Sequence, residues 1–427
     1  MDWNSHRICW SGFCFLLVTA SVSASAETEV AALQDEVKIL KQEVNTLNKT
    51  TAMLNKKVTL LSAEKKQTLP SAAQTKQSLS NSANQSASNK SSVSTESSSP
   101  ATLAHISGYA DAGYVNQGGQ NDHFFLGHFN PIFSMSYRNL LIAEGELELE
   151  INNEGQTETN LEYADLGLFV NNYMMFIIGK MISPLGYFEQ NLHPSWINKL
   201  PTNPPGFAHE QAAPEAEIGM QLRGAIPVWN PAKINYSLFV SNGPEAEVDA
   251  NEIEAIETGG FNADGDSGKV VGGRIGFQPL PNMEFGVSGA AGRVGLFDQT
   301  MIDRRDYSVL GADASYFLQN LQLRGEIIQQ DIPSKSDNTI PGGKWRGWYG
   351  QSSYRFMPTK FEGVVRYGQY TAPEDDQDFN QWALGLDYWF APSIVAKIDY
   401  EFNHATHPDE EDNSIDNAFY FQLAYGF

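Results

Sequence analysis

The sequence has little cysteine, a shortage of basic residues and no long apolar run beyond its first 20 residues. Only 2 of the 427 residues are cysteine, which excludes a disulfide-rich scaffold. Lys and Arg number 28 against 51 Asp and Glu, a net charge of −23, whereas nucleic-acid binders need clustered cations to neutralise phosphates. A membrane helix needs about 20 consecutive apolar residues. These absences exclude a nucleic-acid binder and a bundle of membrane-spanning helices.

Residues 1–26 have the pattern of a secretory signal. Arg7 supplies a basic residue, residues 8–18 are apolar, and residues 24–26 (Ala-Ser-Ala) match an A-x-A cleavage site. A buried N-terminal helix is the alternative interpretation. Both cysteines lie within this segment, so the exported chain is expected to contain no cysteine.

Residues 27–68 are predicted to form an α-helical coiled coil. Apolar residues alternate at spacings of three and four over five heptads, with Val at most a positions, Leu at every d position and polar Thr51 in the one gap. The apolar seam consists of Val30, Leu33, Val37, Leu40, Val44, Leu47, Leu54, Val58 and Leu61. This seam is narrower than a core-facing stripe, although an amphipathic helix on a globular core remains the alternative. Val at a with Leu at d favours two strands in a parallel coil.

Residues 69–102 are mostly Ser, Asn, Gln, Ala and Thr. Such a segment cannot bury enough apolar surface to offset the entropy lost on ordering. We therefore expect a disordered linker between the coiled coil and the rest of the chain.

Residues 103–427 alternate with a period of two, which is typical of β-strands. In the segment 382–390, Trp382, Leu384 and Leu386 point to one face, while Ala383, Gly385 and Asp387 point to the other. Sixteen such segments can be counted, each about as long as the 9–11 residues of a tilted membrane strand. The abundance of Gly, Tyr, Phe and Trp, 36, 17, 24 and 8 residues, agrees with many aromatic strands.

The connections between these strands alternate between short turns and long polar loops. Long loops are expected at 116–123, 152–160, 181–215, 242–267, 294–305, 332–344, 372–378 and 405–416. Short periplasmic turns and long outer loops are the layout of an outer-membrane barrel, whereas a soluble sandwich has no reason to sort its loops in this way. The predicted fold is an all-β transmembrane barrel of 16 antiparallel strands over residues 103–427, preceded by the coiled coil.

This layout also predicts location and assembly. Both ends of the barrel fall on the side of the short turns, so the coiled coil should lie in the periplasm. A sixteen-stranded barrel is wide enough to hold an aqueous channel. The terminal Phe427, with apolar residues at every second position before it, resembles the C-terminal signal read by the barrel-assembly machinery.

If the apolar residues face lipid, the alternate residues line the pore. The acidic set is Glu144, Glu146, Glu148, Glu150, Asp165 and Glu217, and the basic set is Arg223, Arg274, Arg324, Arg355, Arg366 and Lys397. Rings of carboxylate favour cations, so the run of four glutamates predicts a weak cation preference. The alternative is that these charges only solvate the lumen and pair with one another.

The loop 181–215 is rich in proline and aromatic residues and is the longest of the expected loops. Because it is stiff and partly apolar, we expect it to fold inward and narrow the pore. Its candidate constriction residues are Pro184, Glu189, His193, Trp196, Lys199 and Phe207. A surface flap or a trimer latch is the alternative.

No cofactor or metal site is predicted. The loop 242–267 carries eight acids and no Lys or Arg, but the calcium-loop-like run 262–266 is followed by Ser267 instead of Gly, and its twelfth position is Gly273. His404 and His407 lie near acids but are better explained by a solvated loop. The acidic loops are compatible with diffuse bridging by Mg²⁺ or Ca²⁺ to anionic lipopolysaccharide.

Several short motifs resemble the phosphate-selective porin O/P family. They are Ile178-Gly179-Lys180, Pro184-Leu185-Gly186, His193-Pro194-Ser195-Trp196, Glu144-Gly145-Glu146-Leu147-Glu148 and Ser241-Asn242-Gly243-Pro244. The resemblance covers roughly residues 103–427 and implies a sixteen-stranded trimeric porin with an inward-folded third loop. Anion pores of that family rely on arrays of Lys and Arg, whereas residues 101–427 hold 18 Lys and Arg against 43 acids. A branch with an N-terminal coiled coil resembles porin-like siderophore receptors.

The expected function is therefore that of an outer-membrane porin for small hydrophilic solutes or ions. A ferric-siderophore receptor is the first alternative, and a structural protein that tethers the outer membrane to peptidoglycan or a periplasmic partner is the second. An enzyme is not expected, because the histidines are scattered and no G-x-S-x-G motif is present. The expected partners are lipid, lipopolysaccharide, the barrel-assembly machinery and two further copies of the chain, with no nucleic acid.

Overall fold

The computed structural model describes residues 102–427 except 153–154, 250–251, 260–267, 299–300, 336–339, 374–376 and 406–415. The predicted signal peptide at 1–26 and coiled coil at 27–68 lie outside the described residues, as does nearly all of the linker at 69–102. Within the described part, no helix is long and apolar enough to cross a membrane.

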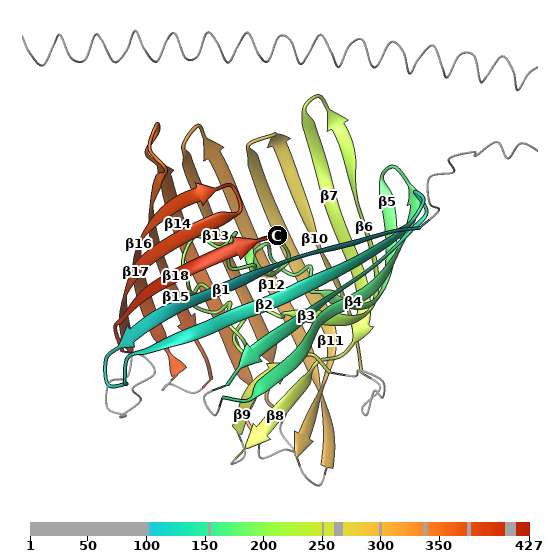
Figure 1. The fold of residues 1–427 in the computed structure, drawn as a ribbon. Helices are drawn as coiled ribbons and strands as arrows, with labels where there is room; N and C mark the ends of the chain where they lie inside the picture. The colour runs from blue at the N-terminus through green and yellow to red at the C-terminus, as the bar shows by residue number, and fades with distance from the viewer. Residues whose placement is uncertain are drawn as a thin grey trace, which may run out of the picture. The chain divides into compact units, whose positions relative to one another are not determined.

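Sixteen antiparallel strands form a closed barrel (Figure 1). They are β1 (Thr102–Gln117), β2 (His123–Tyr137), β3 (Leu141–Ile151), β4 (Thr157–Asn171), β5 (Met174–Ile182), β6 (Ala216–Trp229), β7 (Ala232–Asn242), β10 (Lys269–Leu280), β11 (Met283–Asp298), β12 (Met301–Leu318), β13 (Leu321–Ile332), β14 (Gly343–Arg355), β15 (Phe361–Thr371), β16 (Phe379–Ala391), β17 (Ile394–Ala405) and β18 (Ala418–Gly426). Each strand pairs with the next in this series, and β7 pairs with β10.

The barrel closes between its first and last strands. Tyr109 of β1 lies opposite Gly426 of β18, and Gly108 and Phe427 exchange two backbone hydrogen bonds of 2.9 Å. Closure removes the free strand edges that could not be satisfied in lipid. The predicted sixteen-stranded antiparallel barrel is confirmed.

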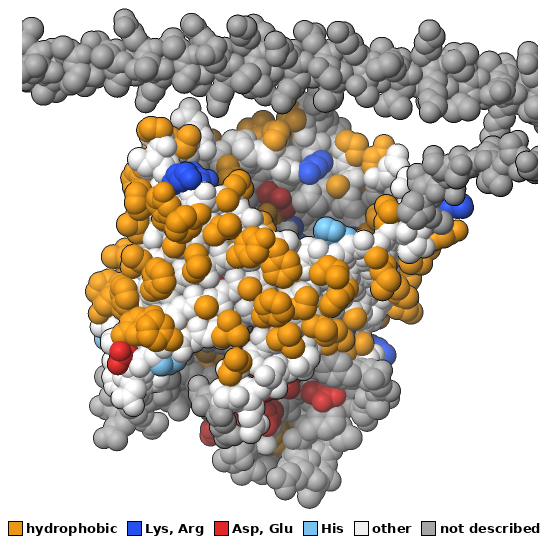
Figure 2. Space-filling model, viewed as in Figure 1, with side chains coloured by type: hydrophobic (Ala, Val, Ile, Leu, Met, Phe, Trp, Pro, Cys, Tyr) orange, Lys and Arg blue, Asp and Glu red, His pale blue; other side chains and the backbone are white. Residues whose placement is uncertain are grey.

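The two faces of the strands differ in chemistry as the period of two requires. In β16, Trp382 is 50% exposed on the outer face, whereas Gln381 on the inner face is 6% exposed. The same alternation recurs along the wall, so apolar side chains cover the outside of the strands (Figure 2). So large an apolar surface is unfavourable in water and fits a barrel surrounded by lipid.

Two of the expected loops contain strands instead. The acidic loop 242–267 holds the hairpin of β8 (Glu245–Asp249) and β9 (Glu252–Glu257), and β8 pairs with β11. The expected loop 294–305 is largely an extension of β11 and β12, because strand pairing continues to Asp298 and Met301. Apolar residues are buried in both segments. Ala246 and Ile253 alternate with acids in the β8–β9 hairpin, and Val294 and Leu296 lie in the extended part of β11.

Candidate functional site

The longest connection, between β5 and β6, folds into the barrel. We call residues 183–215 the long loop. Leu185, Phe188 and Phe207 of this loop are each only 1% exposed, and the Phe207 ring packs edge-on at 5.2 Å against that of Tyr349 on β14. The loop contains α2 (Phe188–Leu192), the one helix in the part of the chain that the structure describes. The predicted inward path of the loop is therefore found, while its role as a constriction remains a prediction.

Glycines on the inner wall make room for the long loop. A Cβ atom on Gly347 would lie 2.6 Å from the Cα of Gly206 in the loop. A Cβ on Gly385 would lie 2.5 Å from Leu200 Cδ2. Real Cβ contacts are longer than this. At Gly347 the clash would be with loop backbone, so only glycine allows so close an approach there, whereas at Gly385 it would be with the end of the Leu200 side chain.

Two basic side chains of the wall hold the middle of the long loop. Arg366 on β15 donates through Nη1 to the carbonyl of Thr202 and through Nη2 to the Thr202 hydroxyl, both at 2.9 Å. Arg366 also donates to Gln381 at 2.9 Å and lies 3.5 Å from Glu401. Lys397 on β17 donates to the carbonyl of Ser195. Both cations thus donate to neighbouring side chains and to loop backbone, while Nε of Arg366 has no hydrogen-bond partner within the described part of the chain.

Acidic side chains fix the beginning of the loop. Glu326 on β13 accepts hydrogen bonds of 2.7 and 3.0 Å from the backbone N–H groups of Tyr187 and Phe188, at the start of α2. Carboxylates at the N-terminus of a helix satisfy N–H groups that have no partner within the helix. Glu217 on β6 accepts from the Ser241 hydroxyl at 2.6 Å and from that of Ser183 at 3.4 Å.

A further ion pair connects the loop to β15. Lys199 lies 3.1 Å from Glu362, and its ammonium group also lies over the Trp389 ring, 4.8 Å from the centroid. Within the loop, the His193 ring donates through Nδ1 to the backbone carbonyl of Glu189. Of the predicted constriction residues, Pro184, Glu189 and Phe207 are buried, whereas His193, Trp196 and Lys199 are partly exposed.

The predicted basic lining needs correction. Arg274, Arg324, Arg366 and Lys397 point inward, but each is 9% exposed or less. They are covered because the loop and neighbouring side chains pack over them. Arg274, for example, lies 2.6 Å from Asp313 and 3.0 Å from Glu284. The acidic Glu217 is buried in the same way. Of the six predicted cations, only Arg223 and Arg355 keep appreciable exposure.

The acidic wall on β3 is less covered. Glu144 accepts hydrogen bonds from Ser134 at 2.9 Å and from Tyr163 at 3.1 Å, and it remains partly exposed. Glu148 and Glu150 are also partly exposed. Glu146 is the exception, since it is buried and accepts from Asn130 at 3.0 Å. Three of the four predicted glutamates thus face space that the long loop leaves free.

Some inner-wall residues were not predicted as site residues. His128 of β2 lies 2.8 Å from Asp111 of β1, and Asn130 donates to the hydroxyl of Tyr109 at 2.8 Å. The alternation that identified the glutamates also places His128 and Asn130 on the inner face of their strand. Asp111 opposes a bulge in β2, so parity alone was a weaker signal for it.

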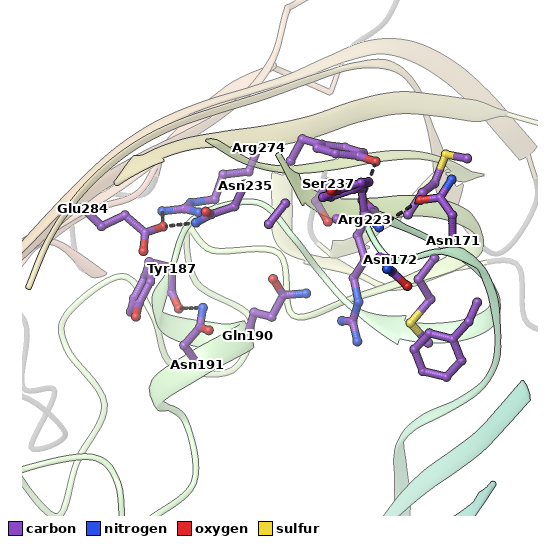
Figure 3. A pocket seen from close by; sticks show the side chains of 17 residues that line it. Asn171, Asn172, Tyr187, Gln190, Asn191, Arg223, Asn235, Ser237, Arg274 and Glu284 are labelled. Atoms are coloured by element: carbon purple, nitrogen blue, oxygen red, sulfur yellow. Dashed lines mark hydrogen bonds and ion pairs between the residues drawn. The ribbon is translucent and has the colours of Figure 1, made fainter. Parts of the chain in front are cut away.

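A cavity of about 450 Å³ opens beside α2, at the end of the barrel that carries the short turn between β4 and β5. Its lining includes Asn171, Asn172, Gln190, Asn235 and Arg223. Figure 3 shows the Arg223 side chain extending into this space between Gln190 and Asn172. Among the described residues, no partner forms a hydrogen bond or ion pair with Arg223. The cavity therefore presents amide groups and one available cation to a solute.

A closed barrel with an apolar outer surface, a polar lumen and an inward-folded loop defines an outer-membrane channel protein. The family model described as Gram-negative porin matches residues 78–408. The chain belongs to this family. The match does not extend to the phosphate-selective porin O/P family or its siderophore-receptor-like branch, which the sequence motifs resemble.

Solved porins share the fold at low sequence identity. An anion-selective porin from Comamonas acidovorans is 14% identical, with 76% of this chain and 100% of that chain covered and a TM-score of 0.53. OmpF of Salmonella typhi in complex with daunomycin is 14% identical over 77% and 98% of the chains, with a TM-score of 0.51. OmpT of Vibrio cholerae, in its trimer form, is 12% identical over 77% and 100%, with a TM-score of 0.50. No curated protein matches the chain.

Proposed function

We propose that this porin is a weakly cation-preferring channel for small hydrophilic solutes and ions, narrowed by the long loop. The observation that carries the proposal is the unequal exposure of the inner charges. Four of the six predicted basic residues are buried beneath the loop or among neighbouring side chains, whereas Glu144, Glu148 and Glu150 stay partly exposed on β3. Exposed carboxylates along a pore attract cations and repel anions.

Reversal potentials in planar bilayers test the proposal. The wild-type chain should pass cations more readily than anions in a KCl gradient. Replacing Glu144, Glu148 and Glu150 together with Gln should move the permeability ratio towards one. A matched control removes the same number of charges from exposed positions of the β8–β9 hairpin, at Glu247, Glu252 and Glu254, and should change the ratio less. Strong anion preference in the wild type would refute the proposal.

The proposal includes a homotrimer in the outer membrane. The V. cholerae relative in trimer form supports this assembly, although the Val/Leu seam of the predicted coiled coil favours two strands. We favour the trimer, because the outer surface that neighbouring barrels would bury is larger than the surface that five heptads would bury. Native mass spectrometry of the purified chain should give three copies, and a dimer would contradict the proposal.

The remaining assignments follow from the same layout. The coiled coil at 27–68 is proposed to lie in the periplasm, where it contacts peptidoglycan or another partner, since both ends of the barrel lie at its short turns. Phe427 is proposed as part of the assembly signal, and the acidic loops as contacts to lipopolysaccharide through divalent cations. No enzymatic activity is assigned, in agreement with a channel family and fold.

A further inference from the structure

A histidine and two glutamates converge on the inner wall between β2 and β3. His128 Nε2 lies 3.9 Å from Glu148 Oε1, and one ligand atom each from His128, Glu148 and Glu150 lies within 4.8 Å of the others. The side chain of His128 is 38% exposed and that of Glu148 is 16% exposed. An ion in the lumen can therefore reach all three groups.

Asp111 fixes the orientation of the imidazole. Its side chain is fully buried, and it bonds His128 Nδ1 at 2.8 Å. It also accepts from Gln422 Nε2 at 2.9 Å, which anchors the carboxylate to β18. A carboxylate acceptor places the proton on Nδ1, so that Nε2 presents a lone pair towards Glu148. Metal-ligating histidines are held by second partners of this kind.

The two carboxylates of this cluster lie close to other acids. Glu148 lies beside Glu150, and its carboxylate is also within hydrogen-bonding reach of Glu162. Among the described residues, no Lys or Arg forms an ion pair with Glu148 or Glu150. Like charges this close repel unless a proton or a cation lies between them. Neutralisation by a bound cation would relieve this repulsion.

We propose that His128, Glu148 and Glu150 bind a divalent transition-metal ion of the zinc type within the lumen. Imidazole selects Zn²⁺, Cu²⁺ or Ni²⁺ over Mg²⁺ and Ca²⁺, which prefer oxygen ligands alone. Three protein ligands leave positions for water, as in exchangeable metal sites. Tetrahedral ligation places ligand atoms roughly 3.4 Å apart, so the glutamates need to move by only about 1 Å. Both are partly exposed and have room for this movement.

Metal binding can be measured on the purified full chain in detergent. Titration calorimetry with Zn²⁺ should show one equivalent more for the wild type than for His128→Ala. Asp111→Asn should lower the Zn²⁺ affinity of this site by about 10–100-fold, as loss of the residue that orients a metal-binding histidine does in other proteins. The control is His123→Ala, since His123 is exposed on the same strand and bonds only the Asn121 carbonyl in the described structure. Circular dichroism verifies that each variant keeps its strands.

A spectroscopic readout separates ligation from indirect effects. Cu²⁺ bound to the wild type should show nitrogen hyperfine coupling from one imidazole in its electron paramagnetic resonance spectrum, and His128→Ala should lose it. Glu150→Gln should weaken binding while keeping the nitrogen signal. Equal Zn²⁺ binding by the wild type and His128→Ala, or equal loss in His123→Ala, would overturn the site.

The metal site also predicts an effect on ion conduction. This prediction rests on the proposed channel function, whereas the prediction of metal binding does not. Micromolar Zn²⁺ should reduce the K⁺ current of the wild type but leave that of His128→Ala unchanged. A chain that binds Zn²⁺ without forming channels would refute the channel and keep the site. A conducting chain without the extra Zn²⁺ equivalent would refute the site and keep the channel.

Discussion

Arg366 provides the sharpest test of how the long loop is held. Replacing it with Met keeps an unbranched side chain of similar length but removes both donors to Thr202 and the partner of Glu401. Hydrogen bonds to charged groups contribute about 1.5–3 kcal/mol each, and breaking a buried ion pair costs about 3–5 kcal/mol. Part of this cost falls on the wall and not on the loop. We therefore assign roughly 3 kcal/mol to the release of the loop around Thr202.

This free energy translates into an accessibility that can be measured. Since about 1.4 kcal/mol corresponds to a factor of ten, the open population should rise roughly 100-fold. The two native cysteines, Cys9 and Cys14, lie in the predicted signal peptide, so Leu200→Cys provides a single reporter in the mature chain. Leu200 is 1% exposed. When opening is fast, its modification by a charged methanethiosulfonate follows the open population.

The comparison needs a control with the same chemistry. Arg355→Met also removes an inward-facing guanidinium, but Arg355 lies over the Trp389 ring and forms no hydrogen bond to the loop among the described residues. Its labelling rate should stay within a few fold of the Leu200→Cys background. A rate in Arg366→Met that matches this control would show that the loop does not depend on Arg366, and the reasoning would fail.

Three further perturbations test other parts of the lumen. Gly347→Ala should destabilise the fold by roughly 1–3 kcal/mol, because its Cβ would meet Gly206, whereas Gly350→Ala has nothing within 4 Å and should be nearly neutral in denaturant titrations. Burial raises the pKa of Glu189 well above 4.5, so the folded chain holds a proton that the unfolded chain releases as pH rises. Stability should fall above about pH 4.5, and Glu189→Gln should gain over the wild type with rising pH; a pH-independent difference in melting temperature would contradict this. Arg223→Glu should increase cation preference in bilayers, and no change in reversal potential would place Arg223 outside the ion path.

The barrel could be predicted because each strand carries its own signal. A side chain either faces lipid or the lumen, so residues such as Trp382 and Gln381 identify their faces without knowledge of any distant contact. The same rule applied to the acidic loop would have found β8 and β9. There the acids alternate with apolar residues such as Ala246 and Ile253, but the charge suggested a solvated loop. Burial of that alternate set stabilises the hairpin.

Strand parity predicts the direction of a side chain but not what lies against it. Arg366 and Lys397 were correctly expected to point inward, yet each meets a loop residue more than 160 positions away in sequence. No local pattern specifies such contacts. The glycines offered a partial signal, since Gly347 and Gly385 interrupt the inner face where the loop approaches. Small inner residues on neighbouring strands indicate where something packs against the wall.

The long loop changes how the net charge of the chain should be understood. If every inward-facing residue is counted, the wall of the lumen carries both basic and acidic side chains. Such a wall does not by itself favour cations or anions. Once the loop docks, Arg366 and Lys397 donate hydrogen bonds to its backbone carbonyls, Arg366 also pairs with Glu401 on β17, and Arg274 is paired with Asp313 and Glu284. The exposed charge is then set mainly by the acids that the loop does not reach. Selectivity and loop position are therefore coupled, so a variant that releases the loop should lose cation preference as it uncovers the basic wall.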